Sequence, residues 1–155
     1  MRRFLGRKPF QAVTASLAVM AAGLGVAGGA QAAATSAQKV PLTQTNRDCG
    51  GSIIGEPLTQ SFGFAVIRKT ARDRLVVEVA LKGGPPHTTY NIRLLQVVAG
   101  DADCTPVDGT LTTDADGNGN ASVKEAVRPN ASSVWVVLNN QADFADFFDT
   151  QVVFF

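Results

Sequence analysis

The sequence predicts an all-β protein, an antiparallel sandwich of two sheets with about seven or eight strands. Segments rich in Val, Ile, Leu, Phe, Thr and Tyr recur roughly every ten residues, and clusters of Gly, Pro, Asn and Asp separate them. No amphipathic segments of helical length lie between them, so the crossover helices of a parallel sheet are not expected. The 155 residues, 45% hydrophobic and 17% charged, suit one folded domain and not a disordered chain.

The clearest strand signal lies at residues 74–82. An apolar row at every second position there predicts one buried sheet face; its members are Leu75, Val77, Val79 and Leu81. Residues 133–139 contain a continuous apolar run that includes Trp135, and this predicts a strand buried on both faces, with the tryptophan as a core filler. Further strands are expected at 62–70, 89–97, 109–113, 120–127 and 150–155. Only residues 142–148 have a helical pattern, of one or two turns at most.

Residues 1–32 have the three-part pattern of a secretory signal peptide. A basic start, MRRFLGRK, precedes an apolar run rich in Ala and Gly, and Ala30-Gln31-Ala32 forms an A-x-A cleavage site. Residues 33–45 are small and polar and predict a flexible N-terminal arm, so the sandwich is expected to span residues 46–155. We expect a secreted, extracellular protein, with the cell envelope as an alternative location. An uncleaved anchor is the competing interpretation of the first segment, and no second stretch of spanning length follows it.

The charge of the chain is uneven. Four of the 14 basic residues lie in the first eight positions, which leaves 10 basic against 13 acidic residues and a net charge near −3 after the signal. Such mild acidity argues against nucleic acid or an anionic membrane surface as a partner. The expected partner is an extracellular protein or a surface ligand of unknown identity.

Two cysteines, Cys49 and Cys104, predict one disulfide. A lone pair of cysteines in a small secreted domain usually forms a cystine, because the compartment is oxidising. Zinc usually takes four ligands, and His87 is the only histidine, so a structural zinc site is not expected. The cysteines also lack the C-x-x-C spacing of a redox-active pair.

The segment LKGGPPHTTYNIRL, residues 81–94, resembles the corner of fibronectin type III and other immunoglobulin-like domains. In that family a leucine, a Pro-containing turn and a tyrosine open the next strand, and the tyrosine hydroxyl bonds a nearby backbone group. The matching residue here is Tyr90. The segment GTLTTDADGNGNASV, residues 109–123, resembles a hairpin of small exported bacterial β-proteins, often actinobacterial. The resemblance implies an immunoglobulin-like sandwich but specifies neither strand order nor function, because more strands follow the corner here than in the family.

Residues 114–125 also satisfy the calcium-loop pattern D-x-[DN]-x-[DN]-G-x5-E. The candidate oxygen ligands are Asp114, Asp116, Asn118, Asn120 and Glu125. An EF-hand needs a helix on each side, whereas the flanks here are strand-like, and Asn-Gly and Asp-Gly are preferred in tight hairpin turns. The pattern favours a plain turn. A calcium-binding sandwich module is the alternative, and no other cofactor is expected.

The sequence predicts a binding or structural module and no enzyme. His87 has no nucleophile or orienting partner in a recognisable motif, so no catalytic residue is assigned. One alternative is a secreted hydrolase inhibitor that presents the loop around Cys104-Thr105-Pro106. A weaker one is a hydrolase that uses paired carboxylates, although loop solvation is the expected role of these acids. They form two groups in the chain: Asp101, Asp103 and Asp108, and Asp143, Asp146 and Asp149.

Overall fold

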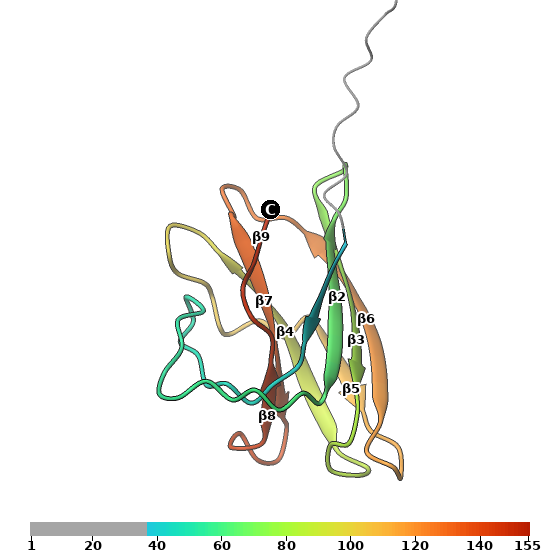
Figure 1. The fold of residues 1–155 in the computed structure, drawn as a ribbon. Coiled ribbons are helices and arrows are strands. Elements are labelled where there is room, and N and C mark those ends of the chain that lie inside the picture. The colour runs from blue at the N-terminus through green and yellow to red at the C-terminus, as the bar shows by residue number, and fades with distance from the viewer. Residues whose placement is uncertain (1–36) are drawn as a thin grey trace, which may run out of the picture. The chain divides into compact units, whose positions relative to one another are not determined.

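The computed structural model describes residues 37–155, which form two antiparallel sheets without a helix (Figure 1). The strands are β1 (Gln38–Pro41), β2 (Gly63–Lys69), β3 (Arg74–Leu81), β4 (Thr89–Val97), β5 (Gly109–Thr112), β6 (Gly119–Ala126), β7 (Ser133–Asn140), β8 (Phe147–Asp149) and β9 (Val153–Phe154). One sheet has the order β1-β2-β3-β6 and the other β5-β4-β7-β8, with β9 also paired to β7. The predicted all-β, two-sheet class is confirmed. The expected signal peptide lies outside the described residues.

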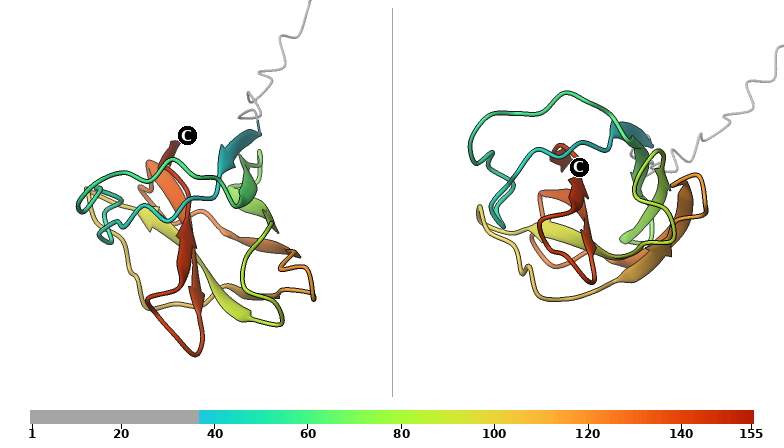
Figure 2. Two further views of the ribbon diagram at one scale, coloured as in Figure 1. Left: turned by 60° about the horizontal axis from the view of Figure 1, so that its bottom comes forward. Right: turned by 90° about the horizontal axis from the view of Figure 1, so that it is seen from below.

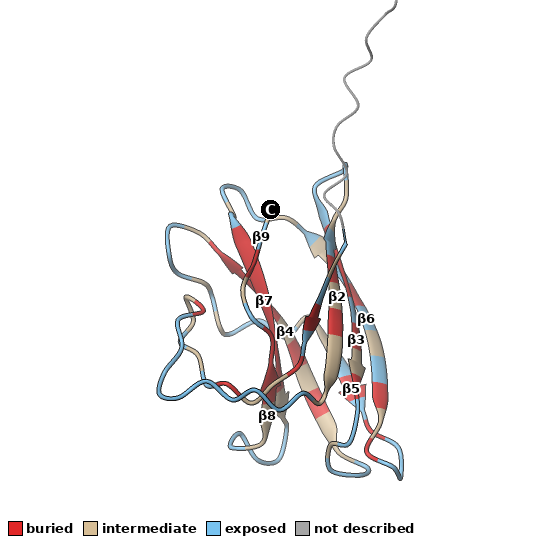
Figure 3. Ribbon diagram, viewed as in Figure 1, coloured by how far each residue is buried: buried red, intermediate tan, exposed pale blue. Residues whose placement is uncertain are grey.

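The core lies between the two sheets, as the burial colours of Figure 3 show. The alternating row of β3, from Leu75 to Leu81, is at most 2% exposed, as its period of two predicts. The facing sheet contributes every second residue of β4 and β7; these are Tyr90, Ile92, Leu94, Val134, Val136 and Leu138. No described residue belongs to a helix that is long and apolar enough to span a membrane.

The segment expected to be a flexible arm, residues 33–45, is ordered from Gln38 onward, so that prediction is wrong for most of its length. β1 pairs with β2, and Thr43 then forms a bridge with Asp149 of β8, so the chain passes from one sheet to the edge of the other. Val40 and Leu42 are buried two residues apart on the core side. Their alternation, together with the open edge of β2, outweighs the small and polar composition of the segment.

The helical turns expected at residues 142–148 are also absent. Residues 141–146 form bends and turns, and β8 follows them. Phe148 is buried and its ring lies 5.0 Å from that of Phe62 and 5.5 Å from that of Tyr90, whereas Phe144 is 65% exposed. A helix would place Phe144 and Phe148 on one face. In the structure β8 pairs with β7 and buries Phe148 in the core, while Phe144 stays exposed.

Tyr90 is the residue that matches the tyrosine of the immunoglobulin-like corner. It is fully buried, but its hydroxyl donates to the carboxylate Oδ2 of Asp146 at 2.6 Å and not to a backbone group. Burial and the Asp146 carboxylate raise the pKa of the phenol above its ordinary value. The expected corner bond is therefore replaced by a bond to the loop between β7 and β8.

β7 is buried on both faces, as its continuous apolar run predicts. Trp135 and Val137 point away from the core and form a second apolar cluster with Leu95 and Val97 of β4. The long loop between β1 and β2, teal in Figure 2, lies beside the β8 and β9 edge of this sheet. This outer face of the second sheet is therefore covered in part by loops, and it carries the candidate site.

Candidate functional site

A pocket of about 470 Å³ opens on the outer face of the β5-β4-β7-β8 sheet. Its floor is apolar and consists of Leu95 of β4 with Trp135 and Val137 of β7, which share a face because successive strand residues alternate. The remaining lining residues are polar or aromatic groups from β4, β7, β8 and three loops. They are Asn46, Arg47, Arg93, Cys104, Asn139, Phe144, Phe147 and Asp149. We call this site the outer pocket.

The disulfide Cys49–Cys104 joins the two loops beside the outer pocket. The loop between β1 and β2 contributes Cys49 and the loop between β4 and β5 contributes Cys104, with 5.8 Å between the Cα atoms. Gly51 lies against the floor with φ +90, and a Cβ there would come within 2.5 Å of Val152 and 3.3 Å of the Trp135 ring. Only glycine fits this approach of the loop to the tryptophan.

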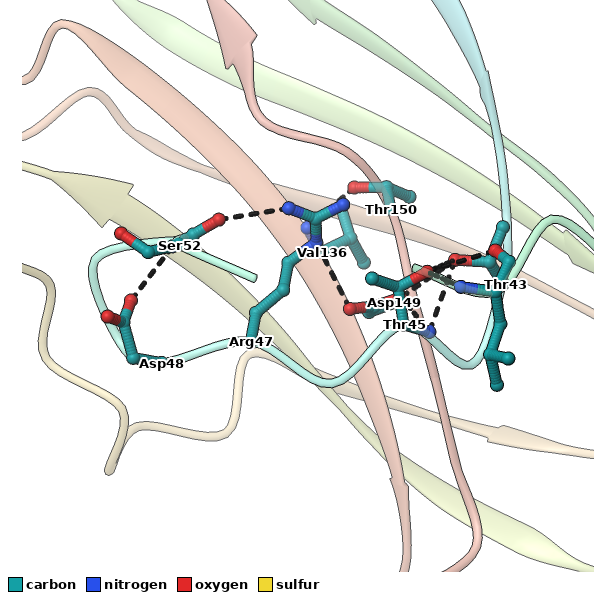
Figure 4. Close-up of polar contacts among 10 residues, drawn as sticks. Thr43, Thr45, Arg47, Asp48, Ser52, Val136, Asp149 and Thr150 are labelled. Atoms are coloured by element: carbon teal, nitrogen blue, oxygen red, sulfur yellow. Dashed lines mark hydrogen bonds and ion pairs between the residues drawn. The ribbon is translucent and has the colours of Figure 1, made fainter. Parts of the chain in front are cut away.

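Arg47 and Asp149 form an ion pair in the wall of the outer pocket (Figure 4). The Nε of Arg47 lies 3.2 Å from Oδ2 of Asp149, and the side chains are 10% and 1% exposed. The other carboxylate oxygen accepts from the Thr43 hydroxyl at 3.0 Å and from the Thr45 amide at 3.2 Å. Burial raises the pKa of Asp149 to about 6, although the Thr43 hydroxyl and the Arg47 charge oppose the increase. The pair thus has no net charge, and it holds residues 43–47 against β8.

The strand pairing along the edge of β7, next to this ion pair, is interrupted between β8 and β9, and this interruption shapes the floor of the outer pocket. Thr150 follows β8, and its hydroxyl accepts the Val136 amide at 3.0 Å in place of a backbone carbonyl (Figure 4). β9 resumes the pairing at Val153. The interruption leaves Val152 packed against the outer apolar cluster, next to Gly51.

Arg93 supplies the uncompensated charge of the outer pocket. Its Nη1 donates to the Asn139 carbonyl oxygen at 2.7 Å, and within residues 37–155 no carboxylate forms an ion pair with it. The buried Nε of Arg93 and the buried indole Nε1 of Trp135 have no hydrogen-bond acceptor. Two guanidinium groups against the one carboxylate of Asp149 leave the lining with an excess positive charge. Such a site offers donors to an anion above an apolar floor.

The candidate calcium ligands do not converge. Asp114 accepts the amides of Asp116 at 2.9 Å and Asn118 at 2.8 Å, which is an ordinary Asx turn. Glu125 pairs with Leu75, whereas Gly119 pairs with Leu81, so strand geometry separates Glu125 from the turn by about 20 Å. Within residues 37–155, no group of three or more His, Cys, Asp or Glu side chains could hold a metal ion. The turn also connects strands of different sheets, so the expected hairpin is wrong.

Loop solvation, the role expected for six aspartates, is wrong for three of them. Asp149 is buried in the ion pair, Asp146 accepts from Tyr90, and Asp108 accepts the Leu94 amide at 2.7 Å where β5 no longer covers β4. Each of these three carboxylates pairs with a cation or accepts a hydrogen bond from a group far away in the sequence. A local sequence pattern does not reveal such a role. Asp101, Asp103 and Asp143 are exposed.

The other predicted site residues lie away from the outer pocket or at its margin. His87 is exposed in a turn with φ 49, and its amide donates to the Asp114 carbonyl. In the loop proposed for hydrolase inhibition, Thr105 and Pro106 are exposed, and Asp103 accepts both the amide and the hydroxyl of Thr105. These two bonds lower the pKa of Asp103. Of these residues only Cys104 of the inhibitor loop lines the outer pocket.

Glu125 occupies a polar position at one end of the interior. Its Oε1 accepts from the buried Gln96 amide at 2.7 Å. Burial raises the pKa of Glu125 to about 7, and the neighbouring Asp108 carboxylate adds to the increase. Because this folded-state pKa lies above the ordinary value of 4.5, the folded chain binds more protons than the unfolded chain between these two pH values. The free energy of unfolding must therefore fall as the pH rises through this interval.

Replacing Glu125 by Gln tests this dependence. We expect Glu125→Gln to raise the free energy of unfolding at pH 8 by about 1 kcal/mol relative to wild type, with little change at pH 5. Urea unfolding at both pH values measures it. The exposed Asp116→Asn is the charge-matched control and should leave the pH dependence unchanged. An equal effect of Glu125→Gln at pH 5 and pH 8 would contradict the assignment.

The chain matches no protein-family model, and searches among curated proteins and solved structures find no significant match. Sequence reasoning did not select Arg47, Arg93, Asn139 or Phe144 as site residues. One signal was available in the sequence. Arg93 lies in a strand of largely apolar residues, at a position that alternation places on the outward face, and this pattern indicates that the outer face is covered.

Proposed function

We propose that this chain is a secreted, non-enzymatic β-sandwich that binds a small organic anion in the outer pocket. The observation that carries the proposal is the presence of two buried donors without acceptors, Arg93 Nε and Trp135 Nε1, in the lining of one pocket. A buried donor without a partner costs about 1–3 kcal/mol. An anionic ligand in this pocket would place an acceptor beside the Arg93 guanidinium, the charged one of these two groups.

The lining indicates the class of ligand. Leu95, Trp135 and Val137 offer apolar surface, and Phe144 and Phe147 add aromatic rings from the loop after β7 and from β8. Arg93 lacks an acidic partner among the described residues, so it favours a carboxylate over a neutral group. The volume, about 470 Å³, lies in the range of small-molecule sites. The ligand is thus a carboxylate with an apolar or aromatic body.

Export is part of the proposal and rests on two independent features. The first 32 residues have the pattern of a cleavable signal. The Cys49–Cys104 cystine, which joins the loops beside the outer pocket, is stable in an oxidising compartment.

Ligand binding can be followed by the fluorescence of Trp135, because it is the one tryptophan of the chain and lies in the pocket floor. We expect phenylacetate and octanoate to change this fluorescence saturably. The neutral phenylacetamide should bind at least about tenfold more weakly, since it lacks the charge that Arg93 recognises.

Arg93→Gln should weaken phenylacetate binding by about tenfold or more and leave phenylacetamide binding nearly unchanged. The exposed Arg72→Gln is the control for the same loss of charge on the other sheet. Equal affinities of the acid and the amide for the wild type, or unchanged phenylacetate binding by Arg93→Gln, would refute the proposal. So would the lack of a saturable response to either carboxylate at concentrations up to about 10 mM.

A further inference from the structure

The outer face of the other sheet carries a cluster of cations that the site above does not use. They surround a shallow groove at the end of the sheet formed by the turn between β2 and β3. The cations are Arg68 of β2, Arg72 of the turn, Arg74 of β3 and Lys124 of β6, all four of them exposed. We call this surface the basic face.

The register of three strands fixes the spacing of these charges. Arg68 pairs with Val76, and Val76 pairs in turn with Lys124, so the two cations flank Val76 in one cross-strand row. Neighbouring strands lie about 4.8 Å apart, which places the Cα atoms of Arg68 and Lys124 about 10 Å from each other. Arg74 lies two residues before Val76 on β3, about 7 Å along the strand. The cations therefore cover a broad surface and do not converge on one point.

The charges of the basic face are not neutralised within the described part of the chain. The ion pairs there join Arg47 to Asp149 and Lys69 to Asp73, and neither includes a member of the basic face. The nearest acid along β3 is Glu78, two residues beyond Val76, which marks the edge of the face. The net negative charge expected from the sequence is thus an average over the whole surface. These basic residues are concentrated on the β2–β3 hairpin and on the neighbouring strand β6.

We propose that the basic face binds an anionic polysaccharide whose sugars bear sulfate or phosphate esters. Cations at spacings of about 7–10 Å on an exposed sheet can contact successive anionic groups of an extended polymer, and each such contact releases counterions. The groove is lined by no aromatic residue that could stack a nucleobase, and single-stranded nucleic acids depend on such stacking. The chemistry of the face therefore fits a polyanion that is read by charge.

The basic face and the outer pocket lie on the outward faces of different sheets. A polymer on the first does not cover the second. The chain can therefore be retained on an anionic polymer while the outer pocket stays open, and the two binding events can be measured separately.

Binding of the protein to immobilised dextran sulfate and to immobilised dextran phosphate tests the proposal, with neutral dextran as the blank. The two polyanions distinguish sulfate from phosphate recognition. We expect the wild type to bind at least one of them, and the affinity to fall steeply with salt. Arg74→Gln/Lys124→Gln should weaken binding about tenfold or more at low salt and make the salt dependence shallower by about one to two units of the log–log slope.

Lys82→Gln/Arg128→Gln is the matched control, because it removes two exposed cations outside the basic face. It should retain binding within about twofold. Equal losses in the two double variants, or no binding of the wild type to either polyanion at low salt, would overturn the proposal. Tighter binding to single-stranded DNA than to both polyanions would overturn it as well. Phenylacetate binding is measured on the same samples, so failure here leaves the proposed pocket function standing, and the reverse also holds.

Discussion

Replacing Cys49 and Cys104 by serine will lower the free energy of unfolding by about 2–4 kcal/mol. The bond closes a sequence separation of 55 residues, for which the chain-entropy argument sets a value of about 4 kcal/mol. It also fixes the loops beside the outer pocket, one of which contributes Cys104 to the lining. We therefore expect weaker phenylacetate binding as well as lower stability. Urea unfolding, followed by the fluorescence of Trp135, measures the first effect, and a ligand titration at low denaturant measures the second.

Wild-type protein in reductant is the control for the cysteine variant, and each single Cys→Ser variant should lose about as much stability as the double variant. Since the cystine acts as one unit, the two single effects must not add. A double variant as stable as the oxidised wild type would show that the loops are held by their other contacts. Those contacts include the Arg47 guanidinium, whose Nη1 donates to the Gly51 carbonyl at 2.9 Å.

Arg47→Met will lower the free energy of unfolding by about 3 kcal/mol at pH 8. The substitution leaves the Asp149 carboxylate 1% exposed and without its counterion. The penalty should shrink at pH 5. Burial already raises the pKa of Asp149 to about 6, and loss of the Arg47 charge raises it further, so the variant protonates Asp149 in the folded state. Stability that an acid with a raised pKa lends to the folded state is present at low pH and is lost as the pH rises.

The double variant Arg47→Met/Asp149→Asn separates charge from packing. An asparagine carbonyl can still accept from Thr43 and Thr45, and it carries no charge that needs a partner. We expect it to recover at least half of the loss at pH 8 and to show no extra pH dependence. If Arg47→Met costs the same at pH 5 and pH 8, the ion pair is not the source of the effect.

The local pattern of the chain predicts most strands to within one or two residues. The burial of β3 and of β7 can be predicted from the order of their apolar residues, because side chains of a strand alternate between faces. β1 and β8 are short strands whose pairing depends on the open edges of β2 and β7. A window along the chain contains no information on such an edge, so the segment around β1 was expected to be flexible and the one around β8 helical.

In the candidate site, too, single residues could be predicted from the sequence, whereas their contacts could not. Trp135 was correctly expected to be buried, but its outward face and its place in a pocket were not predicted. Arg47 meets Asp149, and Arg93 meets Asn139, through contacts between segments far apart in the chain. The calcium-loop pattern of residues 114–125, where a plain turn was the favoured interpretation, shows the reverse case. Its spacing is complete in the sequence, yet β6 is extended and carries Glu125 away from Asp114.

Alternation and composition along the chain already specify two layers of antiparallel strands and a cystine, because both arise from the residue types and their period. Strand pairing and the packing of loops on a sheet decided the rest. They determine which loops meet over β4 and β7, which carboxylate is buried, and where the cations of three neighbouring strands cluster. These contacts join distant residues, and their free energies exist only once the chain is folded.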